Sequence, residues 1–424
     1  MSFLSSSPAV IGFLLLTSGF ILISIRKGRG VIVARYNWLL ICVWGVEPFV
    51  NALNTTIPSL SSPFLGGKLT PGEIVIYSTD LISATFYGIR QKNGISKVRS
   101  NGSDFRIISQ YVRVVPAFLA FIALLEAFAL NQGWIQPLFC CSLFVVCANL
   151  RISSADVIKS AKFSLLLLTL GQLIPVLMGT GLEVCRLDKC FLSSQVFTTL
   201  NAGNRLGLEL LFLASFLLPL ITGGARIVFG ILILYLSILS GSRTGVGVLL
   251  FIVVLILLEN VLAKKLQDLF LRLCLCALLT ISVIPALLTF GGSAFTYRGV
   301  LWEFAKNLIS SSPWTGYGPS YWVRLGLQNG FDANYGTHNI WLDCSVALGV
   351  WANVFLLFWI LLTFRGFAQR FPTGRYLILA LVAAGTVESV LSFWSTAFTI
   401  PVIVSAIIFA SGSDCSPEMN LNSP

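Results

Sequence analysis

The stretch TGVGVLLFIVVLILLENVLA, residues 244–263, decides the fold class. Glu259 is its one charged residue, and its length matches the roughly 20 apolar residues that a helix needs to cross a bilayer. It lacks the alternation of apolar and polar residues that is typical of strands in a membrane β-barrel. Because lipid offers the backbone no hydrogen-bond partners, the sequence predicts a membrane-spanning α-helix here.

Similar apolar blocks recur along the chain. Hydrophobic residues make up 56% of it and charged residues 11%, whereas a soluble domain carries about 25% charged residues. We predict an all-α, polytopic transmembrane bundle of about 12–13 spans, forming a single domain over residues 1–411 with a disordered tail at 412–424. The predicted spans are 8–25, 36–56, 71–90, 111–130, 133–150, 163–182, 207–222, 227–240, 244–263, 271–290, 340–364, 375–392 and 397–411.

The basic residues sit in short clusters between these blocks. The net charge is +11, but the clusters follow alternate spans, as the positive-inside rule expects of cytoplasmic loops. We therefore interpret them as topology signals, and we predict no nucleic-acid partner. The loops on the other side are 57–70, 183–206, 240–243 and 291–339, and the N-terminus is predicted to be external.

The longest of the C-terminal outward loops, residues 291–339, has a sequence that is typical of ordered structure. Val300, Phe304 and Leu308 recur at helical spacing, which predicts a short amphipathic helix lying on the membrane surface. The run Pro313–Pro319 is rich in turn-forming residues, and it permits two interpretations. It is a plain turn, or its glycines let backbone N–H groups approach an anion.

Tyrosine and tryptophan crowd into the same region. The chain has 10 of each, and eight of them lie between 297 and 341: Tyr297, Trp302, Trp314, Tyr317, Tyr321, Trp322, Tyr335 and Trp341. Two interpretations stay open, namely an aromatic belt at the membrane interface and a surface on which sugars stack.

Four motifs in this order resemble a known family. They are Ser240–Thr244 (SGSRT), Tyr297–Gly299 (YRG) with Trp302, Ser312–Gly318 (SPWTGYG) and Thr337–Asn339 (THN). The last three resemble the large periplasmic loop of the O-antigen ligase and polymerase superfamily, and SGSRT is similar to that family's serine-arginine turn. The detailed resemblance covers residues 240–345, and the remainder is similar only as a multi-helix membrane scaffold.

The resemblance implies a metal-independent enzyme of the bacterial inner membrane that needs no cofactor. Its donor would be a glycan linked to undecaprenyl diphosphate, and its acceptor a hydroxyl on the periplasmic face, either of lipid A–core or of a similar lipid or glycan. An alternative within the family is a polymerase of glycan repeat units. An alternative from another class is a transporter, for example of inorganic carbon, although the chain shows no internal repeat of the kind that many transporters have.

Glycan transfer requires that the diphosphate be stabilised and the acceptor hydroxyl be deprotonated. We predict that Arg243 and Arg298 contact the phosphates, because a guanidinium binds phosphate oxygens through two N–H groups. His338, the only histidine, is predicted to be the general base, with Asn339 orienting it. The predicted substrate-binding residues are Asn339, Tyr297, Trp302, Gly316, Gly318, Trp314 and Tyr317.

Two further features concern buried acids and cysteines. Glu126, Asp343 and Glu388 lie in or near predicted spans, where ionisable side chains are costly and often functional, although structural hydrogen bonding explains them equally well. Cys185 and Cys190 lie in a predicted external loop, where an oxidising periplasm would permit a structural disulfide. No CxxC pair and no other histidine accompany them, so no metal site is predicted.

Overall fold

The computed structural model describes most of the chain from residue 103 onward. The described residues are 103–131, 135–148, 154–177, 183–186, 189–192, 202–259, 261–291, 294–322, 336–390 and 399–410, with 41, 44, 82 and 325 as isolated positions. The predicted spans 8–25, 36–56 and 71–90 and the tail 412–424 lie outside this part, isolated positions aside.

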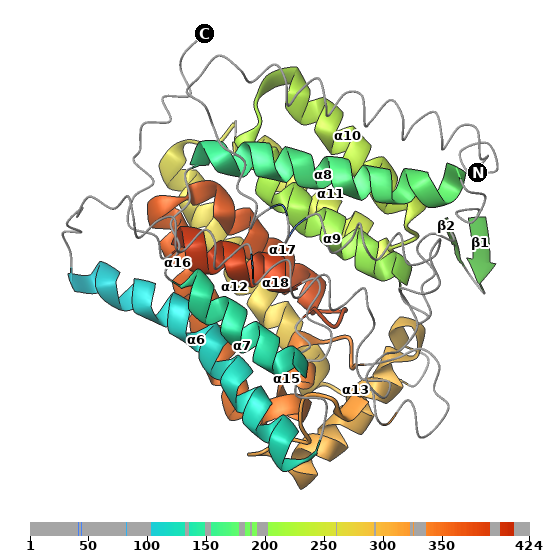
Figure 1. Cartoon of the computed structure of the whole chain (residues 1–424), viewed down its shortest axis with the longest axis vertical. Coiled ribbons are helices and arrows are strands. Elements are labelled where there is room, and N and C mark those ends of the chain that lie inside the picture. Colours follow the sequence, from blue (N-terminus) through green and yellow to red (C-terminus); the bar gives the residue numbers. More distant parts are fainter. Residues whose placement is uncertain are drawn as a thin grey trace.

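The described chain is predominantly helical, as predicted (Figure 1). The α-helices are α6 (Ser103–Ala129), α7 (Ile135–Cys147), α8 (Ser154–Leu177), α9 (Ala202–Leu217), α10 (Gly223–Leu239), α11 (Arg243–Glu259), α12 (Lys264–Leu287), α13 (Ala294–Ser311), α15 (Ile340–Leu348), α16 (Trp351–Arg370), α17 (Arg375–Gly385) and α18 (Thr399–Ser405). Short 3₁₀ turns η4 (Leu218–Leu220) and η5 (Pro372–Gly374) and a π-helical turn η6 (Ala406–Ala410) complete them.

Within the part of the chain that the structure describes, three helices are long and apolar enough to cross a membrane: Ile108–Ala129 within α6, α12 and α16. The apolar segments Pro137–Cys147, Leu206–Leu220 and Gly223–Leu239 are shorter. Helix α11, which contains most of the predicted span 244–263, ends at Glu259 and has 17 residues, a length of about 26 Å. The length and apolar character of these helices support the prediction of a membrane protein.

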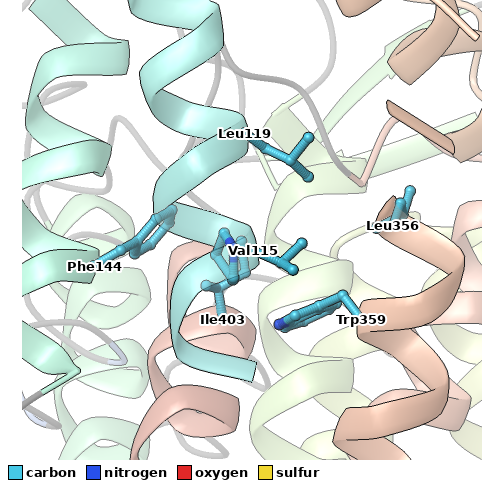
Figure 2. A pocket seen from close by; sticks show the side chains of 7 residues that line it. Val115, Leu119, Phe144, Leu356, Trp359 and Ile403 are labelled. Carbon is cyan, nitrogen blue, oxygen red and sulfur yellow. The ribbon is translucent and has the colours of Figure 1, made fainter. Parts of the chain in front are cut away.

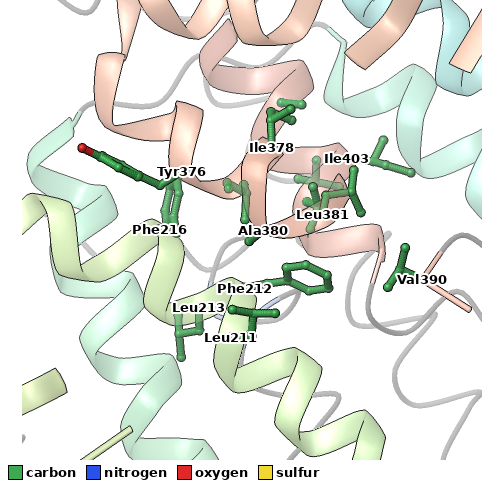
Figure 3. Close-up of a cluster of buried hydrophobic side chains, with 14 of the residues drawn as sticks. Leu211, Phe212, Leu213, Phe216, Tyr376, Ile378, Ala380, Leu381, Val390 and Ile403 are labelled. Atoms are coloured by element: carbon green, nitrogen blue, oxygen red, sulfur yellow. The ribbon is translucent and has the colours of Figure 1, made fainter. Parts of the chain in front are cut away.

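Helix α9 forms the centre of the bundle and contacts α8, α10, α11 and α17. Its side chains from Leu206 to Leu217 are all buried, and Phe212 and Phe216 pack toward Leu381 and Tyr376 of α17 (Figure 3). A helix that is mostly apolar on every side, with Glu209 and Ser215 as its buried polar residues, belongs in an interior of this kind.

A proline in α6 explains one contact between distant helices. Pro116 has no N–H, so the carbonyl of Val112, four residues earlier, loses its helical partner. The indole Nε1 of Trp359 on α16 donates to that carbonyl at 3.2 Å. Val115, Leu119 and the Trp359 ring line a small apolar pocket beside this bond (Figure 2).

Two predicted spans are wrong in their extent. The predicted span 340–364 is two helices, because Gly349 adopts a left-handed φ of 89° between α15 and α16, and a Cβ there would overlap the Trp314 carbonyl. The predicted span 375–392 is helical only to Gly385, and residues 386–390 are irregular. Both departures create the backbone that holds the site described below.

Helices α11, α12 and α17 run between two ends of the bundle. At one end, Arg375 Nη1 pairs with Asp268 Oδ1 at 2.8 Å, and Tyr376 Oη donates to Glu259 Oε2 at 2.8 Å. The opposite end of α12 meets α13 and α15, which lie together in Figure 1.

The one departure from an all-α fold in the described residues is a hairpin. Strand β1 (Glu183–Arg186) pairs with β2 (Lys189–Leu192) in antiparallel register, which sets Cys185 opposite Cys190. Directly opposite residues in such a pair have Cα atoms about 4.5–5.5 Å apart, within the range that a disulfide spans. The predicted disulfide is compatible with this register and stays a prediction.

Candidate active site

Glu388 joins three segments that are far apart in the sequence. Its Oε2 lies 3.0 Å from Nδ1 of His338, and its Oε1 accepts hydrogen bonds from Thr244 Oγ1 at 2.9 Å and from Arg298 Nη2 at 2.8 Å. Its side chain is 5% exposed. We call Thr244, Arg298, His338 and Glu388 the Glu388 cluster.

Glu388 lies past the end of α17, and its ionisation follows from its three partners. Burial by itself would raise the pKa of the carboxyl group. The hydrogen bond and the charge of His338, the charge of Arg298 and the Thr244 hydroxyl outweigh burial and lower the pKa of Glu388 to about 2. The cluster is therefore organised around a carboxylate.

The segment before α15 places His338 in the cluster. Asn339 caps α15, because its Oδ1 accepts the N–H groups of Trp341 and Leu342, both at 3.2 Å. Its Nδ2 donates to the carbonyls of Ser282 at 2.9 Å and Thr386 at 3.1 Å. Asn339 is thus committed to the backbone, and Glu388 contacts the His338 ring at Nδ1.

The serine-arginine turn brings α11 to the same place. Gly241 has a left-handed φ of 68°, and Ser242 Oγ accepts the N–H of Gly245 at 3.1 Å, which caps α11. Arg243 is the first residue of α11 and is exposed, and Thr244 beside it contacts Glu388. The turn therefore lies beside the cluster.

Arg298 enters the cluster from α13, the helix that the sequence predicts within the outward loop. Its side chain is 19% exposed and pairs with Glu388 through Nη2. A guanidinium carries five N–H donors, so this pairing leaves donors for a second acceptor. The predicted apolar stripe of α13 is split, since Ala305 is buried while Val300 and Phe304 are 52% and 37% exposed.

The predicted sugar-stacking role is wrong for Trp302. Its ring is 1% exposed, packs edge-on against Phe290 at 5.1 Å, and donates from Nε1 to the Thr337 carbonyl at 2.8 Å. A ring with no open face cannot stack on a sugar. Trp302 instead braces the residue that precedes His338.

The anion-binding interpretation of the turn at 313–319 is also wrong. The N–H groups of Tyr317 and Gly318 donate to the carbonyls of Val346 and Ala347 at 2.8 and 3.1 Å, and that of Gly316 donates to Ser312. These bonds satisfy carbonyls at the C-terminal end of α15, which a helix leaves unpaired. The turn therefore secures α15, and it does so as a plain turn.

Two of the predicted substrate-binding aromatic residues, Trp314 and Tyr317, have rings that are accessible to solvent. The Trp314 ring is 72% exposed, and Tyr317 is partly exposed beside Tyr321, with ring centroids 4.9 Å apart. Both follow α13 at the end of the bundle that holds the cluster. Tyr297 lies in α13, and its side chain is outside the described part of the structure.

Sequence reasoning singled out Arg298, His338 and the SGSRT turn, which the structure brings together, but missed the residue that joins them. In the sequence, Glu388 stands out only as an acid in a predicted span, and Thr244 only as part of the SGSRT motif. No protein-family model and no curated protein matches this chain.

Proposed function

We propose that the chain is a membrane glycosyltransferase of the O-antigen ligase type. It would move a glycan from undecaprenyl diphosphate to an acceptor hydroxyl of lipid A–core or a similar molecule. The observation that carries the proposal is the contact of His338 Nδ1 with Glu388, in a cluster that includes Arg298 and adjoins Arg243. We further propose a multi-pass protein of the bacterial inner membrane with this cluster facing the periplasm.

The His338–Glu388 pair provides a general base. When Nδ1 carries the ring proton and donates it to Glu388, Nε2 holds the lone pair that takes the acceptor proton. The carboxylate also stabilises the imidazolium that this step creates, as in a serine-protease triad. The acceptor oxygen then bonds to the anomeric carbon, and the bond from that carbon to the diphosphate breaks, its electron pair leaving with the diphosphate.

Arg243 and Arg298 are the residues that would stabilise the leaving diphosphate. One further negative charge develops on the diphosphate as its bond to the anomeric carbon breaks, and fixed guanidinium groups stabilise such charge without reorganising. Arg298 is held in place by Glu388, and Arg243 stands exposed at the start of α11. In this proposal Arg298 fixes the phosphate nearer the sugar, and Arg243 contacts the diphosphate from the open side.

The position of the Glu388 cluster in the bundle supports the proposal that it faces the periplasm. It lies at the end of α11, α12 and α17 opposite Glu259, Asp268 and Arg375. The basic clusters at 264–265 and 365–375 belong to that opposite end, which the positive-inside rule makes cytoplasmic.

The test is transfer of a glycan from undecaprenyl diphosphate by the purified protein in lipid, with lipid A–core and a second lipid-linked repeat unit offered as separate acceptors. Product on lipid A–core supports the ligase, and product only on the repeat unit makes the chain a polymerase. An Arg243→Lys variant with wild-type turnover would contradict the proposed role of that arginine. Flux of a small solute into proteoliposomes, with no glycan transfer to either acceptor, would show that the protein is a transporter and contradict the proposed enzyme.

A further inference from the structure

His338 has a backbone conformation that residues other than glycine rarely adopt. Its φ is 57°, in the left-handed region, where the Cβ of a non-glycine residue is crowded by its own backbone. Such conformations persist when the surrounding structure holds them, and they gather at functional sites. The contacts that hold this one are therefore informative.

Two side chains bind consecutive backbone N–H groups at this point. Ser389 Oγ accepts the N–H of His338 at 3.0 Å. Asp343 Oδ1 accepts the N–H of Thr337 at 2.6 Å and the Thr337 hydroxyl at 2.8 Å. Ser389 comes from the irregular segment after α17 and Asp343 from the first turn of α15, so two separate segments hold the backbone of residues 337 and 338.

The packing around Gly336 leaves the backbone before His338 no room to take another course. A Cβ at Gly336 would overlap Ser389 Oγ and lie 3.2 Å from Asp343 Oδ1, so both side chains meet where Gly336 passes between them. Trp302 Nε1 holds the Thr337 carbonyl from α13. Ser389 also follows Glu388 directly, so one segment holds both the backbone and the ring of His338.

We propose that Ser389 and Asp343 are positioning residues, which hold His338 in its left-handed conformation so that its ring meets Glu388. This inference rests on the proposed function in one respect, that His338 is the base. Loss of either contact lets the backbone relax toward negative φ, which turns the ring away from Glu388. A displacement of about 1 Å lowers turnover on the order of 100-fold, whereas binding of the donor depends on other residues.

The first readout is steady-state transfer by Ser389→Ala, Asp343→Ala and Asp343→Asn. We expect the two alanine variants to lower kcat about 100-fold with KM for the donor within about threefold of wild type. Asp343→Asn keeps an acceptor oxygen, so it restores most of kcat. The matched control is Ser345→Ala, which removes another buried polar group of α15 whose partner is Asn353, and it should leave kcat unchanged.

The second readout does not need substrate. Because His338 is the only histidine, ¹⁵N-histidine labelling gives the signals of this ring alone. At a pH where the imidazole is neutral, wild type and Ser345→Ala should show the proton fixed on Nδ1, and Ser389→Ala should show exchange between the two tautomers. A Ser389→Ala protein that keeps wild-type nitrogen shifts and wild-type kcat overturns the inference, whether or not Asp343→Ala folds.

The two readouts separate the inference from the function it rests on. If wild type transfers no glycan, or His338→Ala turns over normally, the proposed function fails, and the nitrogen shifts alone decide whether Ser389 and Asp343 hold the ring. If transfer depends on His338 but not on Ser389 or Asp343, only the positioning inference fails.

Discussion

Replacing Glu388 by glutamine preserves the shape of the side chain and changes which nitrogen of His338 carries the proton. Glu388 Oε1 accepts hydrogen bonds from Thr244 and Arg298, and Oε2 contacts His338 Nδ1. The glutamine oxygen must keep facing the two donors, because its NH₂ group has only hydrogens to offer them. That NH₂ group then donates to Nδ1, and the ring proton moves to Nε2.

An imidazole with its proton on Nε2 cannot take the proton of the acceptor hydroxyl. The equivalent change in a serine-protease triad lowers kcat on the order of 10⁴-fold, which is about 5 kcal/mol of activation free energy. We expect the same order of loss in Glu388→Gln. KM for the donor should change by less than about fivefold, because both arginines keep their charge.

The assay is steady-state glycan transfer over a range of donor concentrations, followed by ¹⁵N spectra of the single histidine. The matched control is Glu303→Gln on α13, where the carboxylate pairs with Lys306 at 2.8 Å and is 37% exposed. That control should keep wild-type kcat. A Glu388→Gln protein that turns over within about threefold of wild type would refute the role given to Glu388.

Three further predictions concern stability and covalent structure. Trp359→Phe should lower the free energy of unfolding by about 1–3 kcal/mol, because it removes the donor to the Val112 carbonyl that Pro116 leaves without a helical partner. In a Pro116→Ala background the same substitution should cost less, and an equal cost in both backgrounds would contradict this explanation. Because the pKa of Glu388 is lowered from 4.5 to about 2, its ionisation should stabilise the folded state by about 3 kcal/mol above pH 4.5, and this should vanish as the pH falls toward 2. The measurement is the difference in unfolding free energy between wild type and Glu388→Gln against pH, and a flat difference would contradict it. Non-reducing peptide mapping should find Cys185 linked to Cys190, and alkylation of both as free thiols would exclude the bond.

Local sequence patterns predicted most helices of the described bundle. Continuous apolar stretches predict α11 and α16, because burial in lipid or in the core demands the same property along the whole segment. The break at Gly349 was not predictable from its own neighbours. It depends on the turn at 313–319 folding onto the end of α15, where the Val350 N–H donates to the Pro313 carbonyl at 2.8 Å.

The candidate site shows the same division between local and distant information. His338 and Arg298 stood out through residue type and motif, which are local properties. Glu388 contacts residues 50, 90 and 144 positions away, and no spacing rule connects an acid after one helix with a histidine before another. Asn339 and Trp302 were predicted to contact substrate, and the structure places their side chains in hydrogen bonds that hold the backbone.

The most direct test of the central claim is glycan transfer by His338→Ala beside wild type. Both proteins are reconstituted in lipid with undecaprenyl-diphosphate-linked glycan and lipid A–core, and helicity is checked for each. We predict that wild type forms product and that His338→Ala binds the donor but loses at least about 10³-fold in kcat. A folded His338→Ala protein that transfers glycan at the wild-type rate would contradict the account.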